Sequence, residues 1–72
     1  MSPLAITLDE LKVSQRELCR RTGLAYQTVT DAYHGRAPVS LETAVKMAKA
    51  LHVPVYRISP IAAEELAGVA LR

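Results

Sequence analysis

Cys19, His34 and His52 are the residues of this sequence whose side chains suggest metal binding or nucleophilic chemistry. A metal site needs three or four ligands that converge. These three stand far apart in the chain and include no short pair such as Cys-x-x-Cys. A lone cysteine on a helix is usually a small core residue, and we interpret Cys19 in that way. We therefore expect no metal and no cofactor.

Catalysis is not expected either. The sequence has no glycine-rich phosphate loop, and a chain of 72 residues offers little room for the pocket that a catalytic pair of carboxylates needs. No small-molecule ligand is expected for the same reason. These observations favour a binding protein over an enzyme.

The charges are distributed unevenly along the chain. Between residues 12 and 36, five basic residues stand against two acidic ones, whereas residues 59–72 carry one basic and two acidic residues. The basic residues of the middle segment are Lys12, Arg16, Arg20, Arg21 and Arg36. This pattern favours an anionic partner for the middle segment and a different role for the apolar tail, with a merely solvated basic face as the alternative.

The length of the chain indicates one small domain over residues 1–72. Half of the residues are apolar, yet there is no Phe and no Trp, so the core must be built from Leu, Val, Ile and Ala. Cys19 stands alone and allows no internal disulfide, which favours the cytoplasm. No apolar run approaches the 18 or so residues of a membrane span, and no secretion signal is present, so no membrane association is expected.

Capping signals predict the second and third helices. Ser14 with Glu17 three residues later forms a capping box before a helix over residues 15–21. Gly23 ends that helix, because glycine readily takes the left-handed conformation that a helix end often needs. A third helix over about residues 26–34 follows and is ended by a second glycine.

Similar signals predict the other helices. Ser2-Pro3 combines a capping side chain with a proline at the first helical position, while Thr7-x-x-Glu10 offers a later start. Ser40 caps a fourth helix with a strong apolar stripe. Pro54 fits the first turn of a brief helix, and Ser59-Pro60 starts a last helix over about residues 59–70. No segment alternates like a half-buried strand, so we predict an all-α, five-helix bundle.

Two stretches carry a resemblance to a known family. Residues 13–35, VSQRELCRRTGLAYQTVTDAYHG, and residues 40–54, SLETAVKMAKALHVP, resemble the Cro/repressor-type (XRE-like) helix-turn-helix family over about residues 4–58. The resemblance implies a lambda-repressor-like fold with the helix-turn-helix at about residues 14–34. It also implies a bacterial or phage transcriptional regulator, cytoplasmic and nucleoid-associated, that binds double-stranded operator DNA as a homodimer.

The resemblance also implies roles for individual residues. The third helix would lie in the major groove, with base contacts from Tyr26, Gln27, Thr30 and Asp31. Gln27 can pair with adenine and Asp31 can accept from a cytosine amine. The expected phosphate contacts are Ser14, Gln15, Arg16, Thr28, His34 and Arg36. Without the resemblance, Gln15, Gln27 and Thr30 would be interpreted as ordinary solvated helix residues.

The chain departs from the family pattern at several positions. Ala25 stands where the family has a Ser or Thr cap on the third helix, so we expect that helix to lack a side-chain cap. Tyr33-His34-Gly35 stands where the family has Glu-Asn-Gly, next to an expected phosphate contact. His52 stands where a glycine usually ends the fourth helix, which predicts strain or a different turn.

The apolar tail predicts a protein interface. Ile58, Ile61, Leu66 and Val69 offer more apolar surface than a short helix needs to cover its own bundle, although closing that core is the alternative. We predict a two-fold dimer through these residues, which would place two third helices about 34 Å apart on a near-palindromic site. A repressor is the favoured function. The other function left open is an antitoxin-like protein-binding module that represses its own operon.

Overall fold

The computed structural model describes residues 2–70, with the side chains of residues 69 and 70 outside the description. Five α-helices and one 3₁₀ turn follow in order: α1 Pro3–Leu11, α2 Gln15–Thr22, α3 Tyr26–His34, α4 Leu41–Leu51, η1 Val55–Arg57 and α5 Pro60–Ala70. No strand occurs in the part of the chain that the structure describes. The prediction of a small all-α bundle is therefore confirmed.

The first helix begins at Pro3, so the later start at Thr7 is wrong. The Ser2 hydroxyl oxygen accepts from the Ala5 backbone N–H at 3.1 Å, as a capping side chain does. The same hydroxyl donates to the Tyr33 carbonyl oxygen at 2.6 Å. One serine therefore starts α1 and attaches it to α3.

Tyr33 makes a second link between the same two helices. Its hydroxyl donates to the Asp9 carboxylate at 3.2 Å. The charge of Asp9, followed by partial loss of solvent, raises the pKa of the Tyr33 phenol. The backbone carbonyl and the side-chain hydroxyl of Tyr33 therefore both link the end of α3 to α1.

Thr7 does not cap a helix but joins α1 to η1. Its side chain is buried, and its hydroxyl lies 2.9 Å from the Pro3 carbonyl oxygen and 2.8 Å from the Arg57 carbonyl oxygen. The single hydroxyl hydrogen is shared between these acceptors. Arg57 also pairs with Glu10, which adds a side-chain link between the same two elements.

Four helix ends use a left-handed residue, and two of these residues are not glycine. Lys12 ends α1 with φ 57°, and His52 ends α4 with φ 56°. The expectation of strain at His52 is confirmed, because a side chain is disfavoured in this region. Ala25 precedes α3 in an extended conformation and makes no side-chain capping bond, as its residue type predicts.

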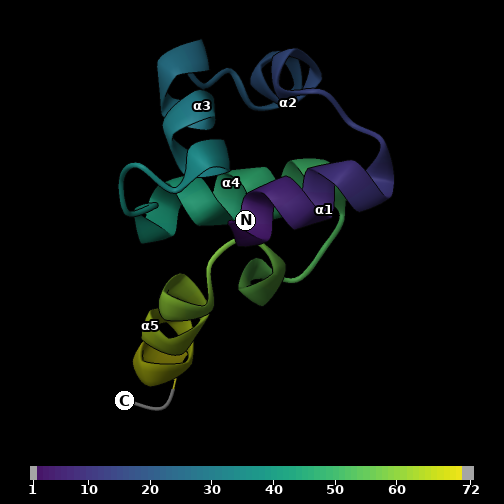
Figure 1. The fold of residues 1–72 in the computed structure, drawn as a ribbon. Coiled ribbons are helices and arrows are strands. Elements are labelled where there is room, and N and C mark those ends of the chain that lie inside the picture. The colour runs from purple at the N-terminus through teal and green to yellow at the C-terminus, as the bar shows by residue number, and fades with distance from the viewer. Residues whose placement is uncertain (1, 71–72) are drawn as a thin grey trace.

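The core lies where α1 to α4 meet and is closed from below by η1 and the start of α5. Its largest fully buried apolar side chains are Leu4, Leu8, Leu18, Val29, Met47 and Ile58. No aromatic side chain is among them, as the composition predicts. Figure 1 shows α2 and α3 on one side of the layer formed by α1 and α4, with most of α5 projecting from the other side.

Candidate nucleic-acid interface

A tight turn fixes α3 relative to α2. Gly23 adopts φ 75°, and its N–H donates to the Cys19 carbonyl oxygen at 2.8 Å. The Thr22 hydroxyl donates to the Leu18 carbonyl oxygen at 2.7 Å and accepts from the Leu24 N–H at 3.2 Å. Backbone and side chain therefore close the turn together. The glycine was evident from the sequence, whereas the Thr22 bridge was not.

The four predicted base-contact residues lie on the part of α3 that faces away from the core. Val29 is fully buried, which orients the helix. Tyr26 and Gln27 are exposed, while Thr30 and Asp31 are half-buried. The first turn of α3 thus presents two long polar side chains to solvent.

Thr30 and Gln15 are joined across the two helices. The Thr30 hydroxyl donates to Gln15 Oε1 at 2.9 Å. Because this bond occupies the carbonyl oxygen, both N–H groups of the Gln15 amide stay available for another acceptor. Gln15 is the first residue of α2, at the positive end of the helix dipole, where an anion such as phosphate is favoured. Sequence reasoning named both residues but not the bond between them.

A second polar connection runs along α3. The Gln27 amide nitrogen donates to Asp31 Oδ1 at 2.9 Å, and Arg36 Nη1 lies 3.8 Å from the same oxygen. Two predicted base contacts and one predicted phosphate contact are therefore connected through a single carboxylate.

The six residues predicted to contact phosphate fall into separate places around α2 and α3. Ser14, Gln15 and Arg16 form the start of α2, Thr28 lies on the first turn of α3, and His34 and Arg36 lie at its end. All are exposed except Gln15, which is half-buried. The Ser14 hydroxyl oxygen accepts from the Glu17 N–H at 3.0 Å, which confirms one half of the predicted capping box, and its own hydrogen remains free to donate. The reciprocal bond from the Ser14 N–H to the Glu17 carboxylate does not form among the described residues, because that carboxylate binds Arg20 and Arg21.

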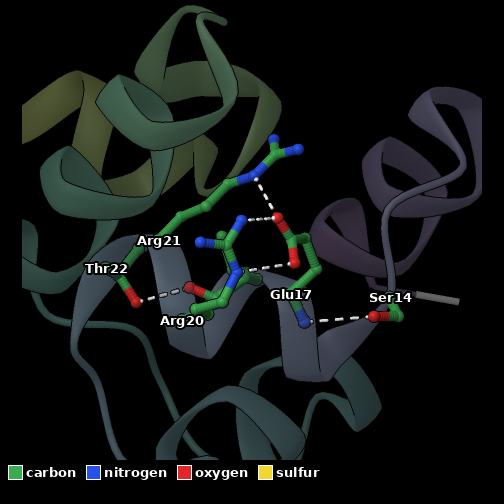
Figure 2. A network of polar contacts seen from close by, with 6 residues as sticks. Ser14, Glu17, Arg20, Arg21 and Thr22 are labelled. Carbon is green, nitrogen blue, oxygen red and sulfur yellow. Dashed lines mark hydrogen bonds and ion pairs between the residues drawn. The ribbon is translucent and has the colours of Figure 1, made fainter.

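Arg20 and Arg21 bind the same acidic residue, Glu17. Figure 2 shows both guanidinium groups at the Glu17 carboxylate, with Arg21 Nε 3.0 Å from Oε1 and Arg20 Nε 3.0 Å from Oε2. Hydrogen bonds from Arg20 and then Arg21 lower the pKa of Glu17 from 4.5 to about 2. Glu17 in turn raises the pKa of Arg20. The single Glu17 carboxylate therefore engages two of the three arginines of α2 and offsets one of their positive charges.

Arg16 differs from its neighbours. Within residues 2–70 it forms no ion pair, and its side chain is exposed. It lines a shallow hollow of about 370 Å³ together with Cys19 and Tyr26. Cys19 is half-buried and packs against the core, in line with its interpretation as a small core residue. The hollow thus places Arg16, which has no ion pair among the described residues, beside Tyr26 at the exposed start of α3.

The predicted dimer residues divide into two groups. Ile58 is only 2% exposed and belongs to the protomer's own core, so its assignment to an interface is wrong. The residue type shows that Ile58 is apolar, but the sequence alone does not show that the same chain covers it. Ile61 is 70% exposed and Leu66 42% exposed. Val69 falls among the residues whose side chains lie outside the description.

Among residues 2–70, no three His, Cys, Asp or Glu side chains gather as metal ligands. No helix in this described range combines the length and the apolar character needed to cross a membrane.

Two short helices joined by a glycine turn, the second with an exposed polar face, define the helix-turn-helix class of DNA-binding domains. The sequence profile of a family described as Helix-turn-helix matches residues 4–58. The chain belongs to this family of XRE-type, DNA-binding regulators, as the resemblance implied over the same residues. Comparisons with curated proteins and with solved structures gave no match.

Proposed function

We propose that this chain is a sequence-specific regulator of transcription, a phage or bacterial repressor that binds a near-palindromic operator as a homodimer. The third helix, α3, would enter the major groove, and bound protein would block access to a promoter. The observation that carries the proposal is the exposed polar face of α3 beside the start of α2, joined by the Thr30–Gln15 hydrogen bond. Base-reading and phosphate-binding groups of such domains lie on these two elements.

The geometry of this interface supports separate roles for its residues. Tyr26 and Gln27 would read base edges, with Gln27 directed at adenine. Gln15 and Arg16 would bind phosphates from the start of α2, where the helix dipole adds a favourable field. Phosphate contacts set the orientation of the domain, and base contacts set its sequence preference.

The exposed side chains of Ile61 and Leu66 support a homodimer formed through α5. Leu66 also lines a groove of about 580 Å³ between α5 and the segment that runs from α4 to η1, which offers an apolar surface to a partner. A second candidate function uses the same surface. An antitoxin-like module would hold a different protein there and repress its own operon.

Selection of preferred sequences from random duplex DNA tests the main proposal. The affinity for the selected duplex is then compared with that for a scrambled duplex at two salt concentrations. A palindromic sequence bound about 10³-fold more tightly than scrambled DNA is expected. Weak binding to every sequence with a steep salt dependence would contradict sequence-specific regulation.

The molecular mass of the purified protein separates the two uses of α5. A stable dimer in the absence of any partner is expected for a repressor. A monomer that aggregates, because Ile61 and Leu66 stay uncovered, would favour the antitoxin-like module.

A further inference from the structure

The side chain of Asp31 is held from two directions on the outward part of α3. Gln27, one helical turn before it, donates its amide N–H to Asp31 Oδ1 at 2.9 Å. Arg36 Nη1 lies 3.8 Å from the same oxygen. Arg36 reaches this position because Gly35 takes φ 69° and ends α3, so that the Arg36 N–H donates to the Asp31 carbonyl oxygen at 2.9 Å.

The carboxylate determines which way the Gln27 amide faces. An ionised carboxylate has only acceptors, so the atom of Gln27 that contacts Asp31 must be the amide nitrogen and not the oxygen. The other N–H and Oε1 of Gln27 remain unoccupied among the described residues, and the side chain is exposed. One donor beside one acceptor, in a fixed order, is the pattern that the N7 and N6 amine of adenine require.

The fixed orientation also disfavours guanine. Guanine presents two acceptors, N7 and O6, in the major groove. With its amide held by Asp31, Gln27 would place Oε1 against one of these acceptors. An unrestrained glutamine could turn its amide and avoid that repulsion.

We propose that Asp31 is a positioning residue for Gln27 and does not itself read a base, and that the pair selects one adenine in each half of the binding site. The proposal rests on the proposed DNA-binding function. Arg36 completes the arrangement, because its positive charge keeps the carboxylate in place and offsets its repulsion of nearby phosphates.

Base preference measured on the full chain tests this proposal. The wild-type protein and the variants Gln27→Ala, Asp31→Ala and the double variant are titrated with the selected duplex. The same duplex is also prepared with each of the three other bases at every position in turn. Circular dichroism confirms that each variant is folded. A bidentate contact typically gives about 5- to 150-fold discrimination against the wrong base.

Gln27→Ala is expected to remove the preference for adenine at one base pair, and Asp31→Ala to remove most of that preference at the same base pair. In the Gln27→Ala background, the Asp31 substitution should cause less than a two-fold further change in preference. Asp31→Asn keeps a carbonyl acceptor for the Gln27 amide and should retain more of the adenine preference than Asp31→Ala does.

Glu42→Ala is a matched control, because Glu42 pairs with Lys46 one turn later on α4, also at 3.8 Å. This variant should leave every base preference unchanged. If Asp31→Ala instead relaxes the preference at a different base pair, or acts equally with and without Gln27, then Asp31 reads its own base and the proposal is wrong. A wild-type protein with no preferred duplex at all would instead refute the proposed function.

Discussion

At the scale of single residues, the three arginines of α2 differ in whether an acidic side chain of the protein pairs with them. Arg20 and Arg21 both bind Glu17, whereas Arg16 forms no ion pair among residues 2–70. Counting basic residues along the sequence therefore overstates the number of arginines on α2 that lack an ion pair. Only the structure reveals which arginines can exchange solvent for phosphate.

Arg16→Ala is expected to weaken binding to every duplex by a similar factor. The logarithm of affinity should also depend less steeply on the logarithm of salt concentration, by about one unit of slope, because one phosphate contact is lost. Titrations at several salt concentrations measure both quantities. Arg20→Ala removes the same charge from a residue already paired with Glu17 and should change the slope by less than half as much. Equal slopes for wild type and Arg16→Ala would remove Arg16 from the phosphate contacts.

Residue-level reasoning from sequence succeeded where the partner is close in the chain. The Ser14 cap and the missing cap at Ala25 depend on a few neighbouring residues, so the sequence alone predicts them. It failed where the partner is distant. The Thr30–Gln15 bond joins residues 15 positions apart and depends on the angle between α2 and α3. The burial of Ile58 depends on how the chain folds back beneath α1 and α4.

At the scale of elements, α3 is the helix with the weakest start. Ser14 and Ser40 cap α2 and α4 through their side chains, whereas Ala25 has no capping side chain. The exposed side chain and extended backbone of Ala25 match those of Ser14 and Ser40. A serine there could accept from the N–H two or three residues later without any change in the backbone.

Ala25→Ser is therefore expected to stabilise the protein by about 1 kcal/mol. Urea unfolding followed by circular dichroism measures the change in the free energy of unfolding. Ser40→Ala is the matched reverse change and should destabilise the protein by a similar amount. A loss of stability in Ala25→Ser would mean that the start of α3 does not have the capping geometry described above.

The hydrogen bonds that Arg20 and Arg21 donate to Glu17 predict that the stability of the protein depends on pH. The pKa of Glu17 is about 2 in the folded chain against an ordinary value of 4.5, so the unfolded chain binds more protons between these pH values. The contribution of Glu17 is therefore fully present above about pH 4.5 and is lost as the pH falls toward 2. Thermal unfolding should show a steeper rise in stability with pH over this window for the wild type than for Glu17→Gln. Parallel curves for the two proteins would contradict a stabilising role for the hydrogen bonds between Glu17 and the two arginines.

At the scale of the whole molecule, the candidate DNA surface and the apolar helix lie on different sides. Figure 1 shows α2 and α3 beyond one side of the α1–α4 layer and most of α5 beyond the other. A partner on α5 would therefore leave the outward face of α3 open to DNA. The order of helices that produces this arrangement was predictable from caps and apolar stripes. The direction in which α5 projects was not, because its sequence is apolar on more than one face.

Ile61→Asp is expected to reduce the dimer fraction, because Ile61 is the most exposed large apolar residue of the described chain and a charge there would be buried in the interface. Sedimentation equilibrium at several protein concentrations measures this fraction. Ile6→Asp is a suitable control, since Ile6 is 45% exposed on α1 and lies outside the proposed interface. Unchanged association in Ile61→Asp would exclude the start of α5 as the dimer surface.

The central claim is that the start of α2 and the outward face of α3 form the surface that meets DNA. Backbone amide chemical shifts of the full chain, measured by nuclear magnetic resonance during titration with the selected duplex, test this claim most directly. The largest changes are expected for residues 14–17 and 25–36, with residues 61–68 of α5 nearly unchanged. Changes concentrated on α5, or spread evenly over the whole chain, would contradict the claim.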